Sequence, residues 1–532
     1  VNMLNALTVL ASLVTLLLLF VYILSNIRYK YWKKKGVPYD TPFPILGNYA
    51  QYILLKNYIG HVLQDLCEKF PQAPYFGAFF GTEPTLVVKD PDVIKLVMTK
   101  DFYYFSGREI SKYTNKEVFT KNIFFSGGDR WKVVRQNLTP LFSSSKMRNM
   151  FYLLEKCAHT FEKMLEEELK DSKELEVRGI MSRYTMACIG SSVFGVDTNT
   201  MDKENKDNPF FTIGNSIFEG TNYRGFKTVA RAIWPSLFYG LGFKSFPETI
   251  DNFFSELLTA VFKGRGYKPS NRNDFVDLIL TFNEKSYITG DSLSNMKDGG
   301  TKKVNINIDN ELLVAQCITF FAAGFETSST TLSFILFELA KNQDAQKRAQ
   351  QEVDDFLKRH NNQIKYECVQ ELPYVEACIY EVLRLYPVVG HLAREVIEDY
   401  SLPSGLTLEK GLRVHIPVYY MHHNPDYFPE PDQYQPERFL PENKLDIKPY
   451  TFFPFGEGPR LCIGLRFAKM QMLAGLVTFL KSYQVTLAED MPTKVQLEPR
   501  SLVTQPMGGV RLRVESREGC RQREFVKSEA NI

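Results

Sequence analysis

The stretch that most constrains this chain is residues 453–467, FPFGEGPRLCIGLRF, where one cysteine, Cys462, stands among three glycines. Glycine has no Cβ and adopts positive φ freely, so such a loop can lie flat against a large ligand. The segment that follows, Leu465–Leu480, has helical periodicity and no proline, which places Cys462 at a helix N-terminus. The helix dipole and the free N–H groups at that position favour a thiolate, which is a good nucleophile or metal ligand.

Arg460 lies two residues before the cysteine and offers a planar guanidinium group that suits a carboxylate. A ligand that carries both a metal and a pendant carboxylate would use both side chains, and haem with its propionates is such a ligand. A lone cysteine is more often a small buried apolar residue. The glycine spacing, the arginine and the helix start together favour the ligand over that interpretation.

This stretch resembles the haem-binding signature of the cytochromes P-450, F-x-x-G-x-R-x-C-x-G, which is filled by Phe455, Gly456, Gly458, Arg460, Cys462 and Gly464. The resemblance implies that Cys462 is the axial thiolate ligand of the iron in heme b (iron protoporphyrin IX), and that Phe455, Arg460 and Gly464 contact the cofactor. Such a thiolate pushes electron density onto the iron and favours O–O cleavage. The implied fold is mainly α with small β-sheets, in which a long central helix lies over the haem and the cysteine loop lies beneath, with an N-terminal transmembrane anchor.

The segment Glu311–Asn342 has the pattern of one long helix. Within Leu312–Leu339 the charged residues are Glu326 and Glu338, so we expect this helix to be buried on nearly all sides. We do not interpret it as a membrane span, because Gln316, Glu326 and a Ser/Thr run would be costly in lipid.

The sequence AGFET, Ala323–Thr327, is expected to interrupt this helix, with Gly324 thinning it so that a ligand can approach the backbone. From the residues alone, Thr327 could donate back to the carbonyl of the preceding turn, and Glu326 could simply be ion-paired. The segment resembles the [AG]-G-x-[DE]-T pattern of the family's central helix. That resemblance implies catalytic roles, in which Thr327 hydrogen-bonds dioxygen and Glu326 relays protons with water.

Three further residues match positions of the family that bind the haem propionates. Trp131 and Arg135 lie four residues apart on one helix face and resemble the family pair on one propionate. The segment Val388–Val396 looks like a strand lining the pocket, and within it Arg394 matches the family arginine on the second propionate.

Glu381 and Arg384, in EVLR, lie at helical spacing, and Arg438 follows in PERF, ahead of the cysteine loop. Surface pairs of the E-x-x-R kind are common, so this motif alone carries little information. In the family the three side chains form a buried structural triad beneath the haem. A buried charge cluster must be complete, so we expect this triad to serve folding and haem retention.

Residues 2–27 carry no charged side chain and are long enough to span a bilayer as a helix. The basic residues that follow, from Arg28 on, would hold their side in the cytosol. A secretory signal peptide is the alternative, but its apolar core is shorter and ends in a small-residue cleavage site. We therefore expect a transmembrane anchor at 1–27, a basic stop-transfer and proline-rich linker at 28–48, the haem-thiolate monooxygenase domain at 49–515 and a polar, disordered tail at 516–532.

Four other segments carry structural expectations. Lys285–Asp309 reads as an exposed loop, and Ser501–Val514 as a closing hairpin that turns at Gly508–Gly509. By resemblance, Phe102–Phe125 is the mobile loop over the substrate pocket. Asn208–Phe246 either caps that pocket at the membrane surface or is a buried core loop. The phenylalanines that could line the cavity, each of them equally suited to core packing, are Phe105, Phe119, Phe124, Phe125 and Phe218.

The charge balance and the cysteine pattern exclude several classes of protein. Lys and Arg number 64 against 61 Asp and Glu, a net charge of +3, which is far from the imbalance of a nucleic-acid-binding protein. The eight cysteines form no C-x-x-C pair or regular framework, which fits a reducing compartment and disfavours zinc or disulfide scaffolds. The sequence has no G-x-G-x-x-G motif and no flavin or nicotinamide domain, so NADPH and flavins would act only through a partner.

The implied reaction is monooxygenation of lipophilic small molecules. Detail in AGFETSSTT resembles the insect microsomal members of the family, which clear xenobiotics such as plant toxins or insecticides; steroid substrates stay open. The expected electron donor is the membrane-bound NADPH–cytochrome reductase, with cytochrome b5 as a second candidate. Lys132, Arg466 and Lys469 are candidate docking charges. The resemblance implies the endoplasmic reticulum membrane, with the catalytic domain facing the cytosol.

Two alternative functions use the same cysteine loop. A haem-thiolate isomerase or lyase rearranges a peroxide without external electrons, and a non-catalytic haem protein would carry or sense a small gas. Neither needs a buried acid beside an alcohol, so the Glu326–Thr327 pair favours the monooxygenase.

Overall fold

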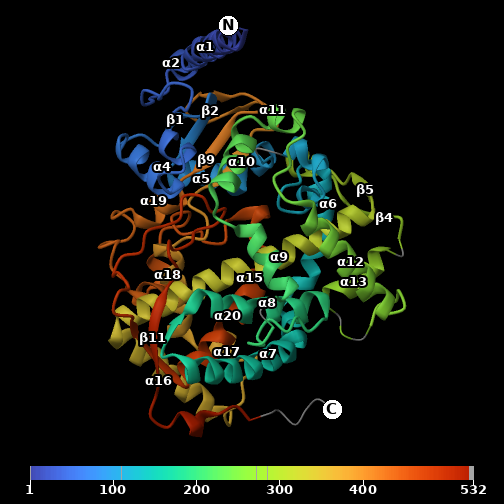
Figure 1. Ribbon diagram of the computed structural model, residues 1–532, viewed down its shortest axis with the longest axis vertical. Helices are drawn as coiled ribbons and strands as arrows, with labels where there is room; N and C mark the ends of the chain where they lie inside the picture. The colour runs from blue at the N-terminus through green and yellow to red at the C-terminus, as the bar shows by residue number, and fades with distance from the viewer. Residues whose placement is uncertain are drawn as a thin grey trace.

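The helix predicted to lie over the cofactor, α15 (Asn310–Lys341), crosses the middle of the molecule in the computed structural model (Figure 1). The structure describes residues 2–108, 111–205, 207–270, 272, 274–283 and 285–526. The side chain of Asp309 caps the start of α15 by accepting a hydrogen bond from Leu312 N at 2.7 Å. Most of the helix is buried, as the near absence of charged residues predicted.

Of the other long helices, α8, α12 and α18 pack against α15, whereas α1 lies apart from it at the end of the molecule marked N (Figure 1). Their bounds are α1 (Asn2–Arg28), α4 (Ile59–Glu68), α6 (Gly128–Leu138), α7 (Ser144–Asp171), α8 (Val177–Ile189), α9 (Pro209–Phe218), α10 (Asn222–Ile233), α12 (Glu248–Gly264), α13 (Phe275–Asn283), α16 (Gln343–Arg359), α18 (Pro373–Leu385) and α20 (Leu465–Leu480). The short helices are α2 (Tyr31–Lys35), α3 (Ala50–Ile53), α5 (Pro91–Lys95), α11 (Pro235–Gly240), α14 (Asn295–Asp298), α17 (Cys368–Glu371) and α19 (Val418–His423).

The strands form small sheets at the edges of the helical core. The largest has the order β1-β2-β9-β6, in which β2 and β9 are parallel and the other neighbours are antiparallel. A second sheet has the order β10-β11-β3, and β4-β5 and β7-β8 are two-stranded. The strand bounds are β1 (Tyr75–Phe80), β2 (Glu83–Val88), β3 (Glu174–Glu176), β4 (Tyr287–Asp291), β5 (Lys303–Asn307), β6 (Leu392–Glu395), β7 (Tyr400–Ser401), β8 (Thr407–Leu408), β9 (Arg413–Ile416), β10 (Tyr483–Leu487) and β11 (Arg511–Ser516).

The helix α15 is continuous through Ala323–Thr327, so the predicted interruption is wrong. A Cβ built on Gly324 would lie 2.1 Å from Cδ1 of Ile189, which belongs to α8. Gly324 therefore lets α8 pack closely against α15, and it does not open the helix to a ligand.

The segment Lys285–Asp309, predicted to be an exposed loop, instead forms the antiparallel pair β4–β5 with α14 between the strands. The pair is fastened to α6, where Gln136 Nε2 donates to Asp291 Oδ2 at 2.5 Å and its Oε1 accepts from Asp291 N at 2.7 Å. The polar, glycine-containing sequence does not predict this strand pair, because the surface that the pair packs against belongs to α6, which is distant in the chain.

The C-terminal region differs from the expectation in two ways. The strand β11 pairs with β10 and β3, so Gly508–Gly509 is not the turn of a hairpin within Ser501–Val514. Residues 516–526 are held to the core, because Arg517 forms an ion pair with Asp354 at 2.7 Å and Arg523 Nε donates to Lys481 O at 2.6 Å. The predicted disordered tail is therefore wrong for this part, and residues 527–532 lie outside the described residues.

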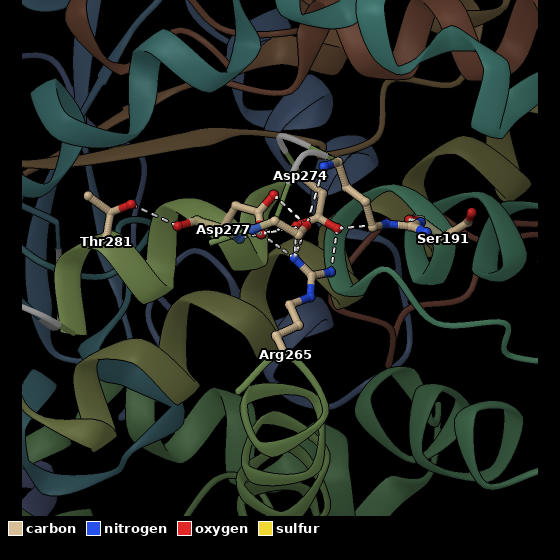
Figure 2. A network of polar contacts seen from close by, with 7 residues as sticks. Ser191, Arg265, Asp274, Asp277 and Thr281 are labelled. Atoms are coloured by element: carbon tan, nitrogen blue, oxygen red, sulfur yellow. Dashed lines mark hydrogen bonds and ion pairs between the residues drawn. The ribbon is translucent and has the colours of Figure 1, made fainter. Parts of the chain in front are cut away.

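A buried ion-pair network joins the end of α12 to α13 (Figure 2). Arg265 donates to both oxygens of Asp274, at 2.8 and 2.6 Å, and to Oδ1 of Asp277 at 2.5 Å. The side chain of Asp274 is fully buried, so its charge requires this complete set of donors. We assign the network to the fold, since it fixes the connection between two helices that flank α15.

Two helices, α15 and α1, are considered as membrane-spanning segments. Among the residues that the structure describes, α15 is the helix long and apolar enough to cross a bilayer, but 78% of its apolar window is buried inside the protein. It is therefore a core helix, as predicted. By contrast, α1 exposes large apolar side chains, which include Leu7, Val9, Leu13, Leu16, Leu19, Phe20, Ile23, Leu24 and Ile27.

Candidate functional site

The cysteine loop is shaped by glycines and closed by the backbone of Cys462. Its N–H donates to Phe455 O at 2.9 Å, and Gly456 and Gly458 have φ of 76° and 69°. A Cβ on Gly458 would lie 2.0 Å from Met98 O, so no other residue fits at that position. The helix α20 begins at Leu465, as predicted, and leaves Cys462 just before its first turn.

Cys462 is exposed by its accessible surface, although many protein atoms surround its thiol. Burial raises the pKa of this thiol, while the N–H of Gly464 and the positive charge of Arg135 act in the opposite direction. The predicted thiolate at a helix N-terminus is therefore not produced by the helix alone, because desolvation is the larger effect. A coordinated metal ion would deprotonate this thiol outright.

Arg460 is nearly fully buried and is held by backbone oxygens. Its Nη2 donates to Ser106 O at 2.9 Å and to Ser126 O at 2.7 Å, and its guanidinium lies 4.4 Å from the ring centroid of Trp131. Burial lowers the pKa of Arg460, and the neighbouring cations Arg108 and Arg394 lower it further. Such a cation is stable only where an anion compensates it.

Three more arginines gather around Arg460. Arg394 is buried, its Nε finds no partner in the part of the chain that the structure describes, and burial lowers its pKa to about 10. Arg135, on α6, donates to Leu461 O at 2.7 Å beside the cysteine. Arg108 was not predicted as a site residue, because nothing in the sequence marked this arginine within Phe102–Phe125. The cations that converge beside Cys462 fit an anionic cofactor such as haem, which carries two propionate groups.

One face of α15 is open to the interior while its neighbours are buried. Thr319, Ala323 and Thr327 are spaced four residues apart and are partly or fully exposed in the middle of a core helix. Thr327 Oγ1 donates to Ala323 O at 2.6 Å, which is the back-bond that the residues alone allowed. The helix α15 also packs against α20, the helix that follows the cysteine loop.

Glu326 is turned away from that face and is buried. Its Oε1 accepts hydrogen bonds from Arg178 Nη2 at 2.5 Å, Gln505 Nε2 at 2.6 Å and Thr330 Oγ1 at 3.1 Å. The ion pair left open by the sequence is therefore present. Arg178 and Gln505 were not predicted, because they lie far from Glu326 in the chain and no local motif marks them.

The structure brings Glu381, Arg384 and Arg438 together. Arg384 donates twice to Glu381, both at 2.7 Å, and Arg438 Nε lies 3.5 Å from Glu381 Oε1. The side chains of Glu381 and Arg384 are fully buried. Burial raises the pKa of Glu381, and the positive charge of Arg384 opposes this.

The candidate cavity phenylalanines divide between core and open space. Phe105 and Phe119 are buried, and Phe218 stacks edge-on against Phe325 with ring centroids 5.6 Å apart. Phe125 is partly buried, whereas Phe124 is 47% exposed and lies under the guanidinium of Arg108 at 4.0 Å. Phe124 is thus the member of this group that borders the arginine cluster.

A surface depression lies behind the cysteine loop. Its volume is about 620 Å³, and residues of α6 and the loop line it, among them Trp131, Lys132, Arg135, Leu461 and Arg466. The cationic side chains that line it belong to Lys132, Arg135 and Arg466, and Leu461, the residue before Cys462, lines it as well.

Together these features define a class of site: a cysteine at a glycine loop, a cluster of buried and partly buried arginines, and an acid next to an alcohol on the central helix. This is the class of haem-thiolate proteins. The model of the family described as cytochrome P450 matches residues 37–511. The chain belongs to the cytochrome P450 family, and it is a monooxygenase with haem held by a cysteine thiolate.

The curated relatives that the chain resembles come from insects. Cytochrome P450 6k1 of Blattella germanica is 35% identical over 537 residues, which cover 99% of this chain and 98% of the relative. Cytochrome P450 6B2 of Helicoverpa armigera is 32% identical and covers 95% of this chain and 98% of the relative. Cytochrome P450 6a2 of Drosophila melanogaster is 33% identical and covers 92% and 96%. The predicted resemblance to insect members is confirmed.

Proposed function

We propose that this protein is a membrane-bound monooxygenase that inserts one oxygen atom of dioxygen into lipophilic xenobiotics, such as plant toxins or insecticides. NADPH supplies the electrons through a reductase. The observation that carries this proposal is the cluster of arginines beside Cys462, because burial lowers the pKa of both Arg460 and Arg394 and a ligand with two carboxylates, such as haem, would compensate their charges. The insect relatives support the substrate class.

Each residue of the site has a proposed part in binding or proton transfer. Cys462 would ligate the iron, Arg460, Arg394 and Arg135 would neutralise the propionates, Trp131 would donate a hydrogen bond to one of them, and Phe455 and Gly464 would pack beside the haem. The bound haem supplies the oxygen-activating chemistry. Thr327 gives up its back-bond to Ala323 O and turns Oγ1 toward the open face. Glu326 relays protons through water to Thr327, and the triad of Glu381, Arg384 and Arg438 keeps the loop in place.

The proposed ligation of the haem iron by Cys462 is tested by the absorption spectrum of the ferrous protein with carbon monoxide. We expect the band of a haem-thiolate, and its loss in Cys462→Ser. A spectrum typical of histidine ligation, or a Cys462→Ser variant that keeps both pigment and turnover, would refute the assignment. Turnover is then measured with reductase against plant toxins, insecticides and steroids, with products identified by mass. Oxygen uptake that requires NADPH distinguishes the monooxygenase from an isomerase.

The depression behind the cysteine loop is the proposed docking site of the reductase. Lys132 and Arg466 line it, whereas Lys469 is paired with Glu376 at 2.7 Å and is largely covered. Opposite charges across such an interface raise the association rate and make it depend on salt. Cytochrome b5 is proposed as a second donor to the same surface.

Charge reversal tests this docking site. We expect the double variant Lys132→Glu/Arg466→Glu to slow reductase-driven turnover about tenfold or more, and to leave turnover with an organic peroxide unchanged. The double variant Lys263→Glu/Lys268→Glu, at exposed positions in and just after α12, is the charge-matched control. Equal loss with both oxidants would place the defect in the site and not in docking.

The proposed anchor is α1, and α10 and α11 provide a second apolar contact with the membrane. Large exposed apolar side chains gather on these elements and the loop that follows: Tyr223, Phe226, Leu237, Leu241 and Phe243. Figure 1 shows α11 at the same end of the molecule as α1. A surface on which large exposed apolar side chains gather is typical of a membrane or protein contact.

This arrangement supports location at the endoplasmic reticulum membrane with the domain at 49–515 facing the cytosol, after an anchor at 1–27 and a linker at 28–48. Removal of residues 1–27 should weaken co-flotation with phospholipid vesicles. The added change Leu237→Ser/Leu241→Ser should abolish what binding is left. Unchanged flotation of the truncated protein would refute the anchor.

A further inference from the structure

The carboxylate of Glu326 is fastened by one of its two oxygens. Oε1 accepts from Arg178, Gln505 and Thr330, whereas Oε2 makes no hydrogen bond within the described residues. Glu326 is only 1% exposed. A carboxylate held in this way can rotate little. The three donors to Oε1 therefore fix Oε2 as the oxygen that is free to exchange a proton.

Gln505 is the uncharged amide among the three donors to Glu326. Its Nε2 lies 2.6 Å from Glu326 Oε1, and its Oε1 accepts a hydrogen bond from Ser501 Oγ at 2.7 Å. The amide orientation follows from chemistry, because an ionised carboxylate can only accept and the hydroxyl of Ser501 can donate. Both ends of the buried amide are therefore committed, and its direction is fixed.

The loop that carries Gln505 is itself held firmly. Thr504 N donates to Val388 O at 2.8 Å, and Thr504 Oγ1 donates to Pro387 O at 2.5 Å. The backbone of Gln505 accepts from Glu498 N at 2.9 Å. Because the neighbouring backbone is fixed on both sides, the amide of Gln505 can move only by rotation of its own side chain, which the hydrogen bond from Ser501 restrains. It acts as a fixed point from which Glu326 is oriented.

We propose that Gln505 is a positioning residue for the monooxygenase reaction. Together with Arg178 it holds Oε1 of Glu326, so that Oε2 is the oxygen that takes and gives the proton. Arg178 supplies the charge and Gln505 supplies the direction, since a guanidinium alone allows the carboxylate to pivot about their common axis. This inference rests on the proposed role of Glu326 as a proton carrier.

The test uses Gln505→Met, which keeps the length of the side chain and removes both amide contacts. Gln496→Met is the matched control, because Gln496 is exposed and precedes the same loop. The holoenzyme is assayed with reductase, NADPH and 7-ethoxycoumarin as the probe. The readouts are the product rate, the share of NADPH electrons recovered as hydrogen peroxide and the solvent deuterium isotope effect. The ferrous carbon monoxide spectrum reports whether the haem site is intact.

We expect Gln505→Met to keep the spectrum, to lower the product rate about tenfold and to raise both the peroxide share and the isotope effect. Gln496→Met should change none of these. Adding Gln505→Met to Glu326→Gln should cause no further loss, because a positioning residue has no effect once its target is gone.

Two other results are distinguishable. If Glu326→Gln impairs proton delivery but Gln505→Met does not, or if the two losses add in the double variant, the inference about Gln505 is overturned and the role of Glu326 stands. If Glu326→Gln leaves the peroxide share and the isotope effect unchanged, the proposed function of Glu326 fails, and the role of Gln505 fails with it.

Discussion

The change Glu381→Gln tests how much the buried triad contributes to stability. Glutamine matches the shape of Glu381 and removes its charge, which leaves Arg384 buried with no ionic partner and Arg438 without its nearest acid. Breaking a fully buried pair in this way costs about 3–5 kcal/mol. The estimate lies near the top of that range, because the side chains of Glu381 and Arg384 are both 0% exposed.

Arg384 also bonds three backbone oxygens, so deleting both charges should not restore stability. It donates to His422 O at 3.1 Å, Pro431 O at 2.7 Å and Gln433 O at 3.1 Å. In Glu381→Met/Arg384→Met these carbonyls lose their donors, and each unsatisfied group costs about 1–3 kcal/mol. The double variant should therefore be at least as unstable as Glu381→Gln.

The assay is urea unfolding followed by circular dichroism, with haem content per protein measured in parallel. The matched control is Glu437→Gln, because Glu437 pairs with Arg348 at 3.0 Å but about half of each side chain is exposed. An exposed pair contributes about 0–1 kcal/mol. If Glu381→Gln lost no more stability than Glu437→Gln, or if the double methionine variant were as stable as the unchanged protein, the reasoning about buried charge would be wrong.

Three further changes are predicted. Gly458→Ala should abolish haem retention, because the new Cβ would lie 2.0 Å from Met98 O and the backbone φ is 69°. The amount of haem pigment per protein measures retention. Gly405→Ala is the control, since open space surrounds Gly405 at a similar φ. Gly324→Ala should destabilise the folded protein by about 1–3 kcal/mol. Adding Ile189→Val should restore part of that stability, because it removes the Cδ1 atom that the new Cβ would contact. If Ile189→Val restores no stability, the proposed close contact between α8 and α15 is wrong. Burial and the charge of Glu117 raise the pKa of Asp251 to about 6, so the folded state holds this proton more tightly than the unfolded state and loses stability as pH rises toward 6. Asp251→Asn should therefore be more stable by about 1 kcal/mol above that pH and equal near pH 4; unfolding in urea at both values measures the difference.

The elements that follow a strong local pattern could be predicted from the sequence. The helix Leu465–Leu480 has the bounds that its apolar periodicity and lack of proline indicated, and α15 begins and ends within one residue of Glu311–Asn342. These elements depend on neighbours in sequence, so the pattern carries the information.

The errors share a physical cause, which is that the partner surface is distant in the chain. The strands β4 and β5 form because α6 accepts them, and residues 516–526 are ordered because Asp354 and the backbone of Lys481 hold two arginines. The same holds for the site. Arg178 meets Glu326 across 148 positions and Gln505 meets it across 179, so no local motif can reveal either contact.

The thiol of Cys462 shows why a local motif and its folded environment can act in opposite directions. A helix N-terminus stabilises an anion by about 0.3–1 kcal/mol near a surface, and that argument predicted a thiolate. Burial is the larger effect and raises the pKa, so the loop does not prepare a free nucleophile. The same burial makes a buried anion depend on a directly bound cation. The surroundings of Cys462 therefore favour a metal ligand over a catalytic nucleophile, and the arginines beside it supply what the carboxylates of the metal's cofactor require.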